Sequence, residues 1–191
     1  MSETEPSLDV LDACVLIPAS LRDVLLRAAA ARLYQPYWSE EILEEVRRNL
    51  VRREMTSPER AERLLETIRR AFPQAMISDY VHLIGEIDIS SSDRHVLAAA
   101  IKAEADSIVT FNLRHFPSAA LSGSNITVKH PDVFLSELAS RVPLTMARIV
   151  VLQAADLRNP PVSIDNLLAR LSIHVPTFVQ LVSSVFEQWS R

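Results

Sequence analysis

The chain has 191 residues, of which 48% are hydrophobic and 23% are charged, and its formal net charge is -4. This composition is typical of one soluble globular domain that can bury a sizeable core. Without an overall basic field, any polyanionic partner has to be met by a local patch of positive charge. The only glycines are Gly85 and Gly123, which excludes a glycine-rich phosphate loop and with it most nucleotide-dependent enzymes.

The cysteine content and the length of the apolar runs indicate the cellular location of the protein. Cys14 is the single cysteine, so no intramolecular disulfide can form, and the opening segment MSETEPSLD lacks the charged-then-apolar pattern of a signal peptide. No run approaches the ~18 uninterrupted apolar residues that a membrane span needs, since even VPTFVQLVSSVF contains a glutamine and two serines. We therefore expect a cytoplasmic protein without a membrane partner.

Short apolar runs alternate with helical patterns in the first part of the chain. The run LDVL predicts a buried strand that ends at Asp12. Ser39 and Ser57 stand where helix caps are expected, before residues that favour the first helical turn. In chain order, the predicted elements are a strand at 8–11, helices at 18–32, 39–53 and 57–72, a strand at 75–78, a helix at 93–105, strands at 107–111 and 126–130, and a helix at 131–140.

This alternation predicts an α/β fold class, with a mainly parallel central sheet covered by helices and a crevice at the carboxyl ends of the strands. Beyond residue 140 only helical patterns remain, at 144–157, 163–171 and 176–189. We therefore expect a first domain at 1–140 and a C-terminal all-helical extension at 141–191. The extension could pack on the first domain as an appendage, mediate dimerisation or cover a partner's binding surface. An appendage is the least demanding of these.

Four polar residues stand at the ends of apolar runs or within helical segments that border them: Asp12, Glu45, Asp93 and Asn112. Strand ends and helix starts converge on one crevice in an α/β domain, and three carboxylates meeting there would repel one another unless a divalent cation held them. The pattern therefore predicts metal-assisted hydrolysis. Simpler structural roles are open as well, because Asp12 could be a turn or cap residue and Asp93 could only favour the helix dipole.

The glutamate of this set has competitors on its own helix. Glu41 and Glu44 lie near Glu45, and helical geometry puts Glu41 and Glu45 on one face. Either could reach the crevice while the others remain solvated.

Four segments, in this order and at this spacing, resemble the PIN domain family, whose bacterial members include the VapC-type toxin ribonucleases. They are VLDACVL, SEEILEEV, DRHVLAAAIKAEAD and SIVTFNLRHF, and the resemblance covers roughly residues 8 to 138. It implies a PIN-like nuclease domain that uses Mg²⁺ or Mn²⁺ to cleave RNA phosphodiesters, with an antitoxin protein and a second copy of the chain as possible partners. By position, Asp12, Glu45 and Asp93 correspond to the first three metal-binding acids, and Asn112 takes the fourth catalytic position.

The chain departs from the family pattern around the expected metal site. The departures are Cys14 in place of the usual asparagine of the first motif, Ser90 and Ser92 where further acids are common, Asn112 in place of the usual fourth acid, and His115 at a position that is acidic in part of the family. Three carboxylates with a neutral amide suit one tightly held ion better than two. The alternative is a PIN-like module that has lost efficient catalysis and binds RNA or protein. A phosphatase with Asp12 as nucleophile is unfavourable, because the second acid of Asp-x-Asp is absent.

Several neighbours of the four residues have two possible roles. Thr110 could hydrogen-bond a metal ligand or could simply be a good strand residue. His95 and His115 lie near the expected crevice, either as ordinary boundary histidines or as groups that take part in catalysis, and His115 could contact phosphate. We expect Cys14 to pack as a small apolar residue, because no base stands nearby in sequence to activate it.

A basic segment follows Glu45. Residues 47–70 contain eight arginines and four glutamates, a local excess of +4. These arginines could guide RNA through phosphate contacts, or meet an acidic segment of an antitoxin. The other possibility is a solvated pair of helices laced with Glu-Arg pairs such as Glu59 with Arg63.

Overall fold

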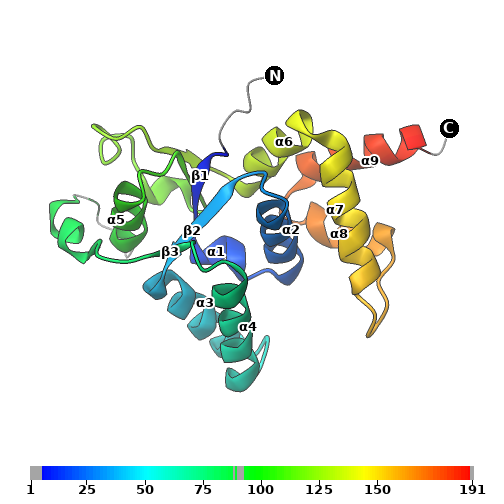
Figure 1. The fold of residues 1–191 in the computed structure, drawn as a ribbon, viewed down its shortest axis with the longest axis horizontal. Coiled ribbons are helices and arrows are strands. Elements are labelled where there is room, and N and C mark those ends of the chain that lie inside the picture. Colours follow the sequence, from blue (N-terminus) through cyan, green and yellow to red (C-terminus); the bar gives the residue numbers. More distant parts are fainter. Residues whose placement is uncertain (1–5, 88, 90–92, 190–191) are drawn as a thin grey trace. The chain divides into compact units, whose positions relative to one another are not determined.

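The computed structural model describes residues 6–87, 89 and 93–189 (Figure 1). Ser90 and Ser92, two of the departures from the family pattern, lie outside the described residues. The chain divides into two compact units. The first comprises Met1–Ile17 and Tyr34–Lys129, and the second comprises Pro18–Leu33 and His130–Arg191.

A five-stranded sheet lies at the centre of the first unit, with the strand order β3-β2-β1-β4-β5 and parallel pairing throughout. The strands are β1 (Leu8–Leu11), β2 (Gln35–Ser39), β3 (Met76–Ile77), β4 (Ser107–Val109) and β5 (Thr127–Lys129). The predicted parallel α/β sheet is confirmed. Because β1 and β4 are parallel neighbours, Asp12 and Thr110 emerge at the same edge, and the Asp12 N–H donates to the Val109 carbonyl at 3.1 Å.

The sequence does not predict β2, which lies beside β1 in Figure 1. Its segment QPYWS contains a proline, and a proline within a run argues against a central strand because it lacks the N–H for the ladder. Alternate N–H groups of β2 point to opposite neighbours: that of Gln35 bonds Ser7 and that of Trp38 bonds Ala75. The ring nitrogen of Pro36 therefore faces the side of β3, where pairing begins only at Trp38, so no ladder bond is lost.

Helices of the first unit connect these strands: α1 (Ala13–Leu16), α3 (Glu40–Arg52), α4 (Pro58–Ala71) and α5 (Arg94–Lys102), with the 3-10 helices η1 (Val81–Glu86) and η2 (Leu113–His115). Both predicted caps are confirmed. The Ser39 hydroxyl accepts from the Ile42 N–H at 3.2 Å, and the Ser57 hydroxyl accepts from the Arg60 N–H at 3.4 Å. Since α3 follows β2 directly, the strand fixes where the glutamates of α3 begin.

Helix α5 packs against β1, β2 and β4 and buries Val96 and Leu97 completely. It is shorter than the predicted helix at 93–105. Asp93 occupies the N-cap position instead of the first turn, and its side chain makes no capping hydrogen bond. The carboxylate of Asp93 is thereby available to groups other than its own helix.

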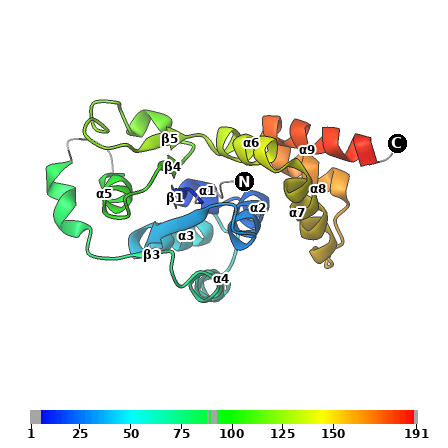
Figure 2. The same ribbon diagram turned by 45° about the horizontal axis from the view of Figure 1, so that its top comes forward.

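The second unit consists of helices within the described residues: α2 (Ala19–Ala30), α6 (Pro131–Arg141), α7 (Pro143–Asp156), α8 (Ile164–Ser172) and α9 (Pro176–Trp189). Figure 2 shows α7, α8 and α9, which pack on one another. Gln153 of α7 donates to the Ser20 carbonyl of α2 at 2.9 Å. Asp132 of α6 caps α9 by accepting from the N–H groups of Thr177 and Phe178 at 3.2 and 2.9 Å.

The compact units do not coincide with the expected division between residues 140 and 141. Helix α6, expected in the first domain, groups with the C-terminal helices, and so does α2 from the N-terminal part of the chain. Contacts such as that between Gln153 and Ser20 join segments 133 positions apart. Sequence periodicity carries no information about such pairings.

No single helix in the described ranges is long and apolar enough to cross a membrane. Among the helices of the described residues, only α6 and α7 taken together meet that test of length and composition, and a bend of 118° separates them. Much of their apolar surface is buried within the unit, including Phe134 and Leu135 of α6 and Met146 and Val150 of α7.

Candidate metal centre

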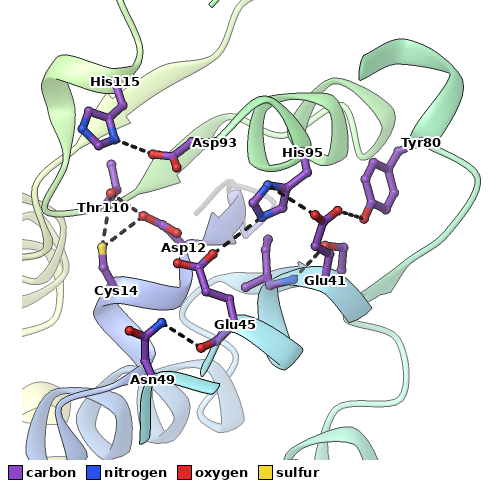
Figure 3. Close-up of polar contacts among 12 residues, drawn as sticks. Asp12, Cys14, Glu41, Glu45, Asn49, Tyr80, Asp93, His95, Thr110 and His115 are labelled. Atoms are coloured by element: carbon purple, nitrogen blue, oxygen red, sulfur yellow. Dashed lines mark hydrogen bonds and ion pairs between the residues drawn. The ribbon is translucent and has the colours of Figure 1, made fainter. Parts of the chain in front are cut away.

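Asp12 directly follows β1 and is 4% exposed. Its Oδ2 accepts hydrogen bonds from the Thr110 hydroxyl at 2.6 Å and from the Cys14 thiol at 3.0 Å (Figure 3). The hydroxyl of Thr110 in turn accepts from the backbone N–H of Asn112 at 3.0 Å. Of the two roles that the sequence leaves open for Thr110, the structure shows the hydrogen bond to a candidate metal ligand. Both donors use the same oxygen, and no described residue donates to Oδ1.

Cys14 has a polar role that the sequence does not predict. Its sulfur lies 3.3 Å from the Thr110 hydroxyl oxygen and accepts from the Phe111 N–H at 3.2 Å, in addition to its contact with Asp12. Burial raises the pKa of the Cys14 thiol, and the Asp12 carboxylate raises that pKa further. The expectation that Cys14 only packs as a small apolar residue is therefore wrong. Its thiol remains protonated and donates to the carboxylate, which also makes it a poor nucleophile.

Glu45 lies on α3 with its side chain 35% exposed. Burial raises the pKa of Glu45, and the carboxylates of Asp12 and Asp93 raise it further, while His95 lowers it. Two charged groups change each other's pKa in this way only when they lie within about 10 Å of one another. Figure 3 shows the three carboxylates in one region, contributed by three separate segments.

The other glutamates of α3 have different partners. Glu44 forms an ion pair with Arg47 at 2.6 Å, and this pair lowers the pKa of Glu44. Glu41 accepts from the Tyr80 hydroxyl at 3.4 Å, and its carboxylate lies 4.0 Å from Nδ1 of His95. Glu45, whose pKa burial and the carboxylates of Asp12 and Asp93 raise, stays the predicted metal ligand of α3.

Asp93 is 8% exposed and contacts a histidine that follows β4. Nδ1 of His115, in η2, lies 2.6 Å from Oδ2 of Asp93 (Figure 3). Two residues after Asp93, Nε2 of His95 lies 3.8 Å from a carboxylate oxygen of Glu45. Both histidines thus lie beside candidate metal ligands, as their positions in the sequence suggest, and each contacts a different carboxylate.

Asn112 has a different environment from the three acids. It is exposed and occupies the N-cap position of η2, where its side chain makes no capping hydrogen bond. Its backbone connects it to Thr110, and through Thr110 to Asp12. The role of its side chain in orienting water or phosphate stays a prediction.

Sequence features could have indicated the two missed contacts. Cys14 occupies the position at which the family usually has a polar asparagine, which favours a polar role beside Asp12. His115 occupies a position that is acidic in part of the family, which places it near the carboxylates. What sequence alone could not supply is the partner of each side chain, because these pairs are separated by 96 residues for Cys14 and Thr110 and by 22 for His115 and Asp93.

The donor chemistry of Asp12, Glu45 and Asp93 fits a hard divalent cation. Their oxygens are the ligands that Mg²⁺ and Mn²⁺ prefer. Burial and, after it, repulsion from Asp12 and Asp93 raise the pKa of Glu45, and a cation would offset that repulsion. As the side chains stand, no three histidine, cysteine or acidic residues in the described part of the chain are close enough to hold one ion. The carboxylates would therefore have to move toward one another on binding.

Comparisons with known proteins agree with this picture. The chain matches the PIN domain model over residues 9–114 and the VapC50 C-terminal domain model over residues 131–184. It is 34% identical over 111 residues to "Putative ribonuclease VapC50" of Mycobacterium tuberculosis, an alignment that covers 58% of this chain and 66% of that protein, just under two thirds of its length. No solved structure gives a significant match. Because the PIN domain match covers more than half of its residues, the chain belongs to the PIN domain family.

Proposed function

We propose that the chain is a metal-dependent endoribonuclease that hydrolyses RNA phosphodiesters, with Mg²⁺ or Mn²⁺ as its cofactor. The observation that carries this proposal is the convergence of Asp12, Glu45 and Asp93 in a member of the PIN domain family. The name of the mycobacterial relative, which describes a ribonuclease, supports the same activity.

The residues of the site have distinct roles in this proposal. Asp12, Glu45 and Asp93 hold the cation, and Thr110 and Cys14 fix the orientation of Asp12 through its Oδ2. Bound Mg²⁺ or Mn²⁺ supplies a water of lowered pKa and offsets negative charge on the phosphoryl oxygens. Asn112, exposed at the start of η2, orients the attacking water or the phosphate.

A second candidate function has one observation in its favour. Asp93 is already engaged by His115 at 2.6 Å, and the described carboxylates do not form a ready metal cluster. A PIN-like module that binds RNA or protein without efficient catalysis would have these features. Metal affinity separates the two functions: the nuclease shows a thermal shift with Mn²⁺ that is lost in Asp12→Asn, whereas the binding module shows none.

We further propose that the enzyme is the toxin of a toxin-antitoxin pair and that it forms a homodimer. The match to the VapC50 C-terminal domain model supports the first part, because it extends the likeness to VapC proteins beyond the PIN domain. Co-expression with the protein encoded beside it should relieve growth inhibition if that protein is the antitoxin. A monomer mass by light scattering at micromolar concentration would contradict the homodimer.

Cleavage of a mixed-sequence structured RNA tests the main proposal. The purified protein is compared in Mn²⁺ and in EDTA, beside an Asp12→Asn, Asp93→Asn double variant whose fold is verified by circular dichroism. Metal-dependent cleavage that is absent from the double variant supports the nuclease. Equal cleavage by the double variant would show that another site, or a contaminant, cuts the RNA. An absence of cleavage with confirmed folding and metal supply transfers support to the binding module.

A further inference from the structure

The arginines of the basic segment are not equivalent. Arg47 is bound by Glu44 on its own helix, and Arg69 of α4 is bound by Glu40 and also lies 3.4 Å from Glu62. These guanidinium groups are neutralised by carboxylates of α3 and α4. They act as surface ion pairs between and along the helices, as the solvated-helix interpretation expects, and they leave little charge for a polyanion.

Two other arginines lie on the same face of α3 as Glu45. Residues 45, 48, 49 and 52 follow the spacing i, i+3, i+4 and i+7, which places them along one stripe of the helix. Arg48, Asn49 and Arg52 line a pocket of about 410 Å³ together with Glu45, Glu41 and His95. Both arginines are exposed. The stripe therefore carries positive charge from the rim of the candidate metal centre toward the end of the helix.

Hydrogen bonds along the stripe hold one of these arginines in place. The side-chain amide of Asn49 donates to the Glu45 carbonyl at 2.9 Å, and its oxygen accepts from a guanidinium nitrogen of Arg52 at 3.0 Å. A guanidinium group has five N–H donors, so this contact leaves donors of Arg52 available. Arg48 lies about one helical turn after Glu45 and lines the same pocket. Arg48 is thus the nearer of the two arginines to Glu45, and Arg52 lies one turn further along α3.

We propose that Arg48 and Arg52, with Asn49 as the residue that positions Arg52, form a phosphate subsite for the RNA backbone next to the cleaved bond. This inference rests on the proposed ribonuclease function. Four residues of helix rise separate the two arginines by about 6 Å along the axis, so that they can contact neighbouring phosphates of one strand. Arginine is suited to this role because its planar donors match phosphate oxygens in pairs.

The polarity of the pocket favours RNA over an acidic protein segment. One end carries Glu41 and Glu45 and the other carries Arg48 and Arg52. A run of acidic side chains along the stripe would meet repulsion at the glutamate end. An RNA strand would place its phosphates opposite the arginines at one end. At the other end, a cation held by Glu45, Asp12 and Asp93 would offset the repulsion between the carboxylates and a phosphate.

The experiment measures the salt dependence of RNA binding. A short fluorescein-labelled single-stranded RNA is titrated with the full chain in EDTA, which prevents cleavage, over a range of salt concentrations. The Arg48→Gln, Arg52→Gln double variant is compared with an Arg60→Gln, Arg63→Gln double variant, which removes the same charge from exposed positions of α4. Cleavage kinetics of all three proteins in Mn²⁺ form a second arm.

Loss of two phosphate contacts in the Arg48→Gln, Arg52→Gln variant should make the slope of log K, the RNA association constant, against log salt shallower by about 1.4. At about 0.1 M salt, RNA binding should be about 25-fold weaker. The α4 control should keep the wild-type slope. In the cleavage arm, KM should rise in the Arg48→Gln, Arg52→Gln variant while kcat changes little, since the subsite binds the ground state and the transition state alike.

The outcomes distinguish the subsite from the function on which it rests. If the wild type cleaves RNA, and both double variants keep its slope of log K against log salt and its KM, the subsite would be overturned and the nuclease proposal would stand. Poly-glutamate is titrated in the same way as the RNA. If the Arg48→Gln, Arg52→Gln variant loses affinity for poly-glutamate and keeps its affinity for RNA, the subsite would be overturned in favour of an acidic protein partner. A wild-type chain that neither binds nor cleaves RNA would overturn both.

Discussion

Thr110 donates a 2.6 Å hydrogen bond to Oδ2 of Asp12, a residue 98 positions earlier in the chain. The two residues follow β4 and β1, which are parallel neighbours, so the bond joins two strand ends at one edge of the sheet. Cys14 donates to the same carboxylate oxygen. An aspartate held by two donors on one oxygen has a fixed orientation before any ligand arrives, and supporting contacts of this kind strengthen metal sites.

Replacing Thr110 by valine should weaken Mn²⁺ binding about 10- to 100-fold, because valine keeps the shape of the strand residue but removes the hydroxyl donor. Thr110→Ser keeps the donor and should bind Mn²⁺ nearly as well as the wild type. Isothermal titration with Mn²⁺ measures both affinities, and urea denaturation verifies that the variants remain folded. Equal affinity of the valine and serine variants would show that the hydroxyl does not support the site.

The contributions of Thr110 and Cys14 should not be additive. Both donate to Oδ2 of Asp12 and they also contact each other at 3.3 Å. Residues that share one partner typically show coupling of about 0.5–3 kcal/mol in a double-mutant cycle. Mn²⁺ affinities of Thr110→Val, Cys14→Ala and the double variant measure this coupling. Strictly additive losses would mean that the two donors act on the carboxylate independently.

Asp9 should make folding stability depend on pH. It is buried in β1 and accepts hydrogen bonds from Ser107 at 2.5 Å and Ser7 at 2.7 Å, yet burial outweighs these bonds and raises the pKa of Asp9. The folded state therefore holds this proton more tightly than the unfolded chain. The contribution of Asp9 to stability is complete below the ordinary pKa of an aspartate and is lost as the pH rises through its folded-state pKa.

An Asp9→Asn variant should remove that loss, since the amide has the same shape and cannot ionise. The free energy of unfolding of Asp9→Asn, minus that of the wild type, should increase from acidic toward neutral pH. Urea denaturation across this range measures the difference. A constant difference would mean that Asp9 ionises equally well in the folded and unfolded chains.

Glu54 should be a site where glycine stabilises the protein. It follows α3 with a φ of 54°, in the left-handed region, and its N–H donates to the Val51 carbonyl while that of Met55 donates to the Leu50 carbonyl. This is the helix-ending motif in which glycine is preferred. A left-handed residue with a side chain costs about 1–2 kcal/mol, and the greater freedom of glycine in the unfolded chain offsets about 0.5–1 kcal/mol of it.

We therefore expect Glu54→Gly to be about 0.5–1 kcal/mol more stable than Glu54→Ala. The alanine variant is the matched control, because both substitutions remove an acidic group near a helix C-terminus, where negative charge is unfavourable. Thermal or urea denaturation of the two variants gives the difference. An alanine variant as stable as the glycine variant would contradict the assignment of strain to this position.

Local sequence signals were enough for much of the first unit. The apolar runs at β1 and β4 and the serine caps at residues 39 and 57 involve only neighbouring residues, and these elements were found where they were expected. The sequence does not predict strand β2, because a proline normally breaks the hydrogen-bond ladder of a central strand. Pro36 fits here because its ring nitrogen faces the side of β3, where pairing begins only at Trp38. The grouping of α2 with α6 to α9 depends on contacts between distant segments, which no local pattern encodes.

The candidate site shows the same limit. Periodicity placed Glu41 and Glu45 on one face of α3 but could not choose between them, because the choice depends on where Asp12 and Tyr80 lie in space. The polar role of Cys14 was missed for a related reason. Its thiol becomes a donor only because folding brings it beside a buried carboxylate.

Mn²⁺-dependent RNA cleavage by Glu45→Gln, compared with cleavage by Glu44→Gln, tests the proposed metal centre. The two glutamates are adjacent on α3 and the substitutions change the same charge, but Glu44 is paired with Arg47 on the surface. If Glu45 holds the cation with Asp12 and Asp93, Glu45→Gln should lose cleavage by about 10- to 100-fold or more, whereas Glu44→Gln should cleave like the wild type. Full cleavage by a folded Glu45→Gln variant would contradict the proposed metal centre.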